Sequence, residues 1–376
     1  MRAYVFTDKA LRRYAGQFVW LSLDVEKAEN AQYRKKYATD ALPMFFVLDP
    51  KTEKAALRWV GGATVPQLQK ILADGAAAVK GTGRGVETSL ARADRLYGEG
   101  NYEQAAAAYR EAIAKAPAGW APYGRSVESL LFALYQTKDY VGCAKVARDA
   151  YPRLSRTSSA ANIAASGLSC ALELPKTDPS RAEIVASFAQ DSRAILTAPR
   201  KDIAADDVSA VYETLASERE DAGDEAGQKT VLRERATFLE AAAAKAKTPD
   251  ARAVFDSHRL GTYLDLKEPE RAIPMLQASE RDLPGDYNPP ARLAVAYRAM
   301  KKYDDALAAS DRALAKAYGP RKLGILQTRS DIYKEMGNLP EARKAMQQAV
   351  ELAESLPEGQ RSEKSIASLK KKLEAL

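Results

Sequence analysis

Short apolar runs separated by polar stretches dominate the first eighty residues of this 376-residue chain. Residues 17–25 (QFVWLSLDV) are rich in valine, leucine and aromatic side chains, which predicts a strand buried on both faces. Residues 43–49 (PMFFVLD) and 54–62 (KAALRWVGG) predict a second and a third strand. The Asp-Pro-Lys-Thr turn between these two runs predicts that they form a hairpin.

Two helices are expected around these strands. The first covers 27–40 (KAENAQYRKKYATD), where two tyrosines spaced four residues apart share one face. The second covers 64–75 (TVPQLQKILADG), with Thr64 as N-cap, Pro66 in the first turn and Gly75 near the C-terminal end.

This order of elements resembles the second half of a thioredoxin fold. The matching residues are 21–50 (LSLDVEKAENAQYRKKYATDALPMFFVLDP) and 59–72 (WVGGATVPQLQKIL). In that family a proline at the position of Pro43 is cis, begins a strand and faces the active-site dithiol. The resemblance therefore implies a cis peptide bond between Leu42 and Pro43. It also implies that Gly61-Gly62 is the turn between the last strand and the last helix.

The first half of the thioredoxin fold, with its Cys-x-x-Cys, has no counterpart in this sequence. Residues 1–16 (MRAYVFTDKALRRYAG) resemble the tail of the helix that would carry the cysteine pair. Two explanations stay open: the natural start lies upstream of Met1, or the two remaining buried strands pair directly in a reduced fold. Without the missing central strand, an open sheet edge would favour self-association.

After a glycine-rich stretch at 80–88 (KGTGRGVET), which predicts a linker, the pattern changes to paired amphipathic helices. Residues 89–117 predict a helical hairpin that turns at Gly100-Asn101 and ends at Pro117. This segment resembles a tetratricopeptide repeat, a motif of about 34 residues that buries its faces by stacking on neighbouring repeats.

The same spacing of small and bulky side chains recurs in the second helix of the predicted repeats. The pattern weakens between 158 and 245, although 211–235 still predicts a hairpin that turns at Gly223-Asp224. We expect about seven repeats, closed by a capping helix at 362–376 (SEKSIASLKKKLEAL). The recurring sets are Ala105, Tyr109 and Ala112; Cys143, Ala147 and Ala150; Ala272, Leu276 and Ser279; Ala306, Ser310 and Ala313; and Ala342, Met346 and Ala349.

The predicted fold class is therefore α+β followed by all-α. A partial thioredoxin-like fold occupies 1–79, a linker occupies 80–88, and a tetratricopeptide α-solenoid with its capping helix occupies 89–376.

Charge and hydropathy narrow the partners and the compartment. The net charge is +7, of which residues 1–80 carry +5 (13 basic against 8 acidic) and the remainder +2 (44 against 42). A nearly neutral repeat segment argues against nucleic acid as the main partner. No window reaches the length of a membrane span, and the charged first residues do not form a signal peptide. The expected location is cytoplasmic as written, or periplasmic or exported if the start lies upstream.

Few residues suggest chemistry. Cys143 and Cys170, the only cysteines, are placed to meet across antiparallel helices, either as a disulfide or as two small buried thiols. His258 is the only histidine and has no nucleophile near it in the sequence. We therefore expect no catalytic residue, no metal site and no cofactor.

The leading hypothesis is a non-enzymatic scaffold that binds a protein or peptide in the concave groove of the repeats, beside a redox-inactive thioredoxin-like module. Four basic residues predicted on first helices are groove candidates: Arg92, Arg95, Arg298 and Lys301. The alternative is a thiol–disulfide oxidoreductase whose Cys-x-x-Cys half precedes Met1.

Overall fold

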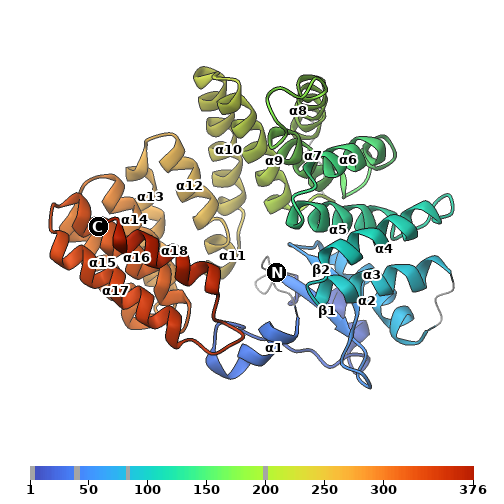
Figure 1. Ribbon diagram of the computed structural model, residues 1–376, viewed down its shortest axis with the longest axis horizontal. Coiled ribbons are helices and arrows are strands. Elements are labelled where there is room, and N and C mark those ends of the chain that lie inside the picture. Colours follow the sequence, from blue (N-terminus) through green and yellow to red (C-terminus); the bar gives the residue numbers. More distant parts are fainter. Residues whose placement is uncertain (1–4, 38–42, 82–84, 198–201) are drawn as a thin grey trace. The chain divides into compact units, whose positions relative to one another are not determined.

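The computed structural model describes residues 5–37, 43–81, 85–197 and 202–376. The chain divides into two compact units, each assembled from two separate pieces of sequence. Unit 1 combines Met1–Phe18 with Tyr37–Arg235, and unit 2 combines Val19–Lys36 with Ala236–Leu376. Figure 1 shows that helices dominate the chain. In the described residues, no helix combines the length and the apolar composition needed to cross a membrane.

The small sheet is an antiparallel hairpin of β1 (Met44–Leu48) and β2 (Ala55–Val60). Phe45 pairs with Trp59 across it. The Asp49 carboxylate closes the turn by accepting hydrogen bonds from the backbone N–H of Lys51 and the hydroxyl of Thr52, both at 2.9 Å. These two bonds lower the pKa of Asp49. The predicted hairpin is confirmed.

The strand predicted at 17–25 is wrong. These residues form no strand in the structure, and Val19 and Leu21 are 88% and 68% exposed. A strand needs a neighbour to accept its backbone hydrogen bonds, and within the described residues the sheet contains only β1 and β2. The helix predicted at 27–40 is shorter, with a 3₁₀ turn η2 (Ala28–Asn30) followed by α1 (Ala31–Lys36).

Helix α2 (Val65–Val79) packs across the hairpin. Thr64 caps it as predicted, in a capping box with Gln67, and Pro66 lies in its first turn. Gly75 does not end the helix: it is buried against Val47 of β1, where a Cβ atom would collide with the valine side chain.

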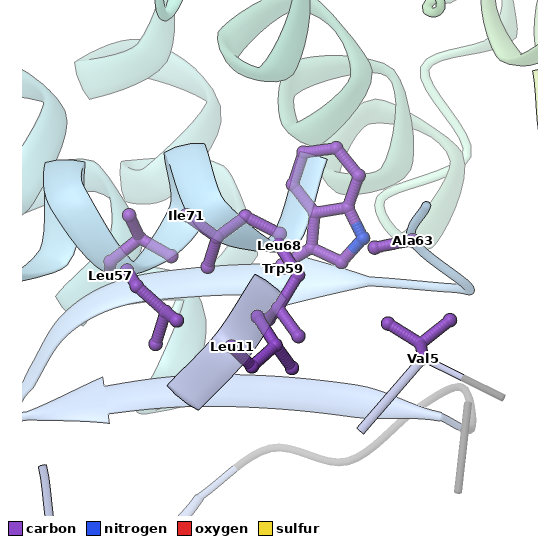
Figure 2. Packing of buried hydrophobic residues seen from close by; sticks show 8 residues of the cluster. Val5, Leu11, Leu57, Trp59, Ala63, Leu68 and Ile71 are labelled. Carbon is purple, nitrogen blue, oxygen red and sulfur yellow. The ribbon is translucent and has the colours of Figure 1, made fainter. Parts of the chain in front are cut away.

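The core of this region joins three pieces of chain. Figure 2 shows Leu57 and Trp59 of β2 beside Leu68 and Ile71 of α2, with Leu11 in the same cluster. Leu11 belongs to the 3₁₀ helix η1 (Lys9–Tyr14), where the sequence predicted the tail of a longer helix. This packing removes Leu57 and Trp59 of β2 from water and leaves the apolar side chains of β1 half-buried.

Helices follow one another in pairs from residue 86 to the C-terminus. The recurring side chains named above are all buried, so the predicted phase is confirmed. The turn at Gly100 has a φ of 79° and the turn at Gly223 a φ of 72°, the left-handed conformation that glycine adopts without strain. The pairs in unit 1 are α3 (Val86–Gly98) with α4 (Tyr102–Ala114), α5 (Tyr123–Gln136) with α6 (Tyr140–Leu154), α7 (Ala160–Leu172) with α8 (Arg181–Thr197), and α9 (Ala205–Asp221) with α10 (Glu225–Ala244), whose last residues belong to unit 2.

Unit 2 continues the same pattern and ends in a cap. The short α11 (Pro249–Ala253) precedes it, and the last helix, α18 (Glu363–Glu374), buries Ile366 and Leu369 as predicted. The pairs are α12 (Asp256–Asp265) with α13 (Ala272–Asp282), joined by η3 (Pro269–Arg271), α14 (Asn288–Ala299) with α15 (Tyr303–Lys316), and α16 (Arg321–Glu335) with α17 (Leu339–Ser355).

The N-terminal piece of unit 2 is fastened to its last repeats by one arginine. Arg321 donates to Asp24 (2.7 Å) and Glu26 (2.6 Å), and Tyr318 also donates to Asp24. Burial, followed by this bond to Asp24, raises the pKa of Tyr318 to about 12. Gln360 adds hydrogen bonds to two backbone carbonyls of the same segment. Residues almost 300 positions apart are thus held together.

We expect Gly359→Ala to release this segment, because a Cβ atom there would overlap the backbone carbonyl oxygen of Ala31. Trypsin cleavage after Lys27, followed by mass spectrometry, should become several-fold faster. Gly324→Ala on α16 is the matched control, since open space surrounds that position and alanine favours helix. Equal cleavage rates in both variants would show that the contact does not hold the segment.

Candidate functional site

A buried polar cluster joins the first two repeats of unit 1 to the hairpin. The carboxylate of Asp94 on α3 accepts a hydrogen bond from Tyr109 on α4 (2.7 Å) and forms an ion pair with Arg125 on α5 (2.8 Å). Arg125 also donates to the backbone carbonyl of Arg58 on β2 (3.2 Å). Asp94 is fully buried and Arg125 is 9% exposed. The cluster therefore connects three helices and one strand through side chains that water does not reach.

The electrostatics of this cluster favour the ion pair. Burial raises the pKa of Tyr109, and the neighbouring Asp94 carboxylate raises it further. The tyrosine hydroxyl therefore stays protonated and donates a hydrogen bond. Burial opposes the charge of Arg125, but the carboxylate outweighs that effect and raises its pKa. The guanidinium of Arg58 stacks on the ring of Tyr97, 3.1 Å from its centroid.

A second set of buried acids lies further along the first helices of unit 1. Glu128 on α5 accepts a hydrogen bond from the amide of Asn162 on α7 (3.3 Å). Burial raises the pKa of Glu128 to about 7, and the bonds from Ser159 and Asn162 only partly offset this. Asp207 on α9 is also buried, and burial raises its pKa well above the usual range. The sequence analysis missed these acids. The only signal was an acidic residue at a helix position where the amphipathic pattern calls for an apolar one.

The four groove candidates differ in their surroundings. Arg92 is exposed and Arg95 half-buried on α3. Arg298 on α14 donates to two acids on α16, Asp331 (2.9 Å) and Glu335 (2.8 Å).

The sequence predicted that Lys301 lies on a first helix, and this prediction is wrong. Helix α14 ends at Ala299, and Lys301 is in the following turn with a φ of 57°.

The two cysteines meet between α6 and α7. The structure places Cys143 and Cys170 in a disulfide with a Cα–Cα distance of 6.0 Å, and both side chains are fully buried. This antiparallel arrangement is the one that the sequence suggested for a disulfide.

Pro43 and His258 were the other two residues considered in the sequence, and the structure places them as follows. Pro43 is exposed before β1, and its carbonyl accepts a hydrogen bond from Gly61 (2.9 Å). The peptide bond predicted to be cis includes Leu42, which lies outside the described residues. His258 is half-buried on α12. Over residues 5–37, 43–81, 85–197 and 202–376, no three His, Cys, Asp or Glu side chains are grouped to hold a metal ion.

We expect Asp94→Ala to destabilise unit 1 by about 3–5 kcal/mol, because Arg125 would stay buried without its counter-ion. Tyr109→Phe is the comparison and should cost about 1 kcal/mol, since it removes one hydrogen bond and keeps the packing. Urea unfolding followed by tryptophan fluorescence measures both. Similar losses for the two variants would show that the ion pair is not the main element of the cluster.

We expect the stability of unit 1 to fall as the pH rises through 7. The pKa of Glu128 is about 7 in the folded chain, and its ordinary value, which applies to the unfolded chain, is 4.5. The folded state therefore binds the proton more tightly. The stabilisation is complete below pH 4.5 and is lost as the pH rises past about 7. Glu128→Gln should therefore gain up to about 3 kcal/mol relative to the parent between pH 5 and pH 8. Exposed Glu103→Gln on α4 is the control; a parallel pH profile for all three chains would contradict the assignment.

Comparison with known proteins identifies one part of the chain. The family model described as tetratricopeptide repeat matches residues 287–355, which include α14, α15, α16 and α17. A comparison with curated proteins gave no match.

Several solved structures align at low identity. A tetratricopeptide repeat protein from Parabacteroides merdae is 13% identical with a TM-score of 0.44, covering 78% of this chain and 100% of that chain. BtubC from P. vanneervenii is 15% identical with a TM-score of 0.35 (74% and 97% covered). The TPR2AB domain of yeast Sti1, in a complex with pHSP90, is 12% identical with a TM-score of 0.29 (77% and 98% covered). These scores are too low to carry an argument about shape or function. The family match is sufficient for one conclusion: residues 287–355 are tetratricopeptide repeats.

Proposed function

We propose that this chain is a non-enzymatic scaffold that binds a protein or peptide along the first helices of its repeats. The observation that carries the proposal is the tetratricopeptide match at 287–355 together with the charged side chains on its first helices. Repeats of this kind stack on one another and form an extended concave surface that is available to a partner.

Two first helices of unit 2, α14 and α16, share a cluster of charged side chains. Arg298 connects α14 to α16 through Asp331 and Glu335, and these three side chains remain partly exposed. Side chains tied together across neighbouring repeats are held in fixed positions, which lowers the entropy cost of binding a partner. The surface carries both signs of charge, which suits the backbone and polar side chains of a peptide better than a polyanion.

We further propose that residues 43–79 cap the first repeat instead of acting as a separate thioredoxin-like module. This rests on β2 packing against α3 and on the hydrogen bond from Arg125 to the Arg58 carbonyl. A solenoid needs its terminal apolar face covered, and a hairpin with one helix can do this. Self-association through the sheet edge stays a prediction.

No observation on the described residues favours the oxidoreductase alternative. The chain's two cysteines are fully buried and bonded to each other inside the repeats. A reactive cysteine needs an accessible thiolate, which neither of these can supply in the folded chain. We therefore propose no redox activity for the residues present.

A site-specific photocrosslinker tests the scaffold proposal. We expect benzoylphenylalanine at Val295 on the first helix α14 to form adducts with a discrete partner in cells of the source organism. Exposed Arg343 on the second helix α17 is the control. Val295 is only half-buried, so greater crosslinking from Val295 could not result from greater exposure. Adducts should be at least several-fold more abundant from Val295.

The added variant Arg298→Ala should reduce the adducts by breaking the bridge to α16 without touching the core. Equal crosslinking from Val295 and Arg343, or none from either position, would contradict binding on the first helices.

A further inference from the structure

Unit 1 contains a cavity of about 320 Å³, lined by residues of unit 1. Helix α2 forms one side, the segment leading into α5 forms another, and the end of α6 with the following turn closes it. This volume is at the lower end of the range of small-molecule sites, which begins near 300 Å³. The cavity is large enough for a compact organic molecule.

Aromatic rings in fixed positions form its apolar walls. Trp59 donates its indole N–H to the carbonyl of Gly62 (3.0 Å), and Trp120 donates to the carboxylate of Glu87 (3.2 Å). Both indoles are largely buried, so these bonds hold the rings in place. Tyr123 at the start of α5 adds a third ring. Such walls favour a ligand with a planar apolar body.

The lining contains three cations, Lys70, Arg125 and Arg153, and one acid, Asp74. Arg125 is already paired with Asp94, so Lys70 and Arg153 supply the charge available to a ligand. The Arg153 guanidinium lies 3.7 Å from the centroid of the Tyr123 ring and makes one long hydrogen bond. Lys70 donates to the carbonyl of Ala121. Since a guanidinium has five donors and an ammonium three, both side chains keep donors available for a ligand.

The N-terminal end of helix α5 opens into the same cavity. Its N-cap residue, Pro122, makes no side-chain cap, and its first residues line the cavity. An uncapped N-terminus presents backbone N–H groups and a partial positive charge. Independently, the Nε atom of Arg125 is buried without a hydrogen-bond acceptor, although this side chain is more than nine-tenths buried. Because this atom is closed off from the cavity as well as from solvent, a bound anion would act on Arg125 through its charge and not through a hydrogen bond to Nε.

We propose that this cavity binds a small organic anion, with its planar apolar body between the indoles and its carboxylate or phosphate near Arg153, Lys70 and the start of α5. This site is separate from the proposed peptide surface and does not depend on it. Asp74 opposes the ligand's charge: it lines the cavity and makes no hydrogen bond in the described structure. The affinity is thereby limited by one identifiable side chain.

The test uses phenyl phosphate and phenylacetate as probes on the full chain, with benzylamine as the charge-reversed control and inorganic phosphate as the control without an apolar body. Two of the chain's three tryptophans line the cavity, so fluorescence titration and calorimetry both report occupancy. At least one aromatic anion should bind, and benzylamine and inorganic phosphate should bind at least about tenfold more weakly. The stronger of the two anions identifies carboxylate or phosphate as the preferred group.

Three variants assign the contacts. Arg153→Met and Lys70→Met replace exposed side chains and should each weaken the anion about three- to tenfold. Asp74→Asn should tighten it by a similar factor, because it removes the opposing charge. Circular dichroism checks that each variant is folded. Binding of benzylamine equal to that of the anions, no binding of either anion, or unchanged affinity in all three variants would overturn the proposal.

Discussion

The buried ion pair between Asp94 and Arg125 is the interaction on which the N-terminal part of this chain depends. It joins the first helices of two successive repeats, and Tyr109 and the backbone of β2 add hydrogen bonds to it, although the Nε atom of Arg125 is left without an acceptor. Replacing such a pair with apolar side chains of the same volume is often neutral or stabilising, so its presence is weak evidence for stability. What it supplies is a specific position: neither repeat can shift relative to the hairpin without leaving a charge unpaired in the core. We infer that this constraint keeps residues 43–79 attached as a cap.

The same constraint places the cavity. Arg125 is both the partner of Asp94 and part of the cavity lining, so the ion pair holds its guanidinium beside the start of α5. The indole of Trp59 belongs to the hairpin core and also forms a wall of the cavity. A site built from the core side chains of three elements is rigid, because none of these groups can turn away without losing packing. The cap is thus what creates a concave site at this end of the repeats.

Local patterns in the sequence predicted most of the repeat helices, and long-range contacts were not predictable. The repeat phase was readable because its signal, such as Ala105 and Ala112 around Tyr109, lies within one helix. The bonds from Arg321 to Asp24 and Glu26 join residues almost 300 positions apart, and no short motif marks them. Residues 17–25 were misread for a related reason: valine, leucine and aromatics favour a strand only where a neighbouring strand exists. The proximity of Cys143 and Cys170 was predictable from helix spacing and turn position, but these left open whether the two thiols form a disulfide.

The candidate sites were the least predictable part because they depend on burial more than on residue type. Glu128 and Asp207 are ordinary surface residues by composition, yet burial between first helices raises their pKa values. Arg298 was recognised as a first-helix cation, but its acidic partners on the next repeat could be assigned only from the packing of α14 on α16. In a repeat protein each helix contacts only its neighbours, so a polar side chain acquires its role from the adjacent repeat. The chemistry of such a chain therefore lies in the pairs that neighbouring repeats create, and a single repeat considered alone does not reveal it.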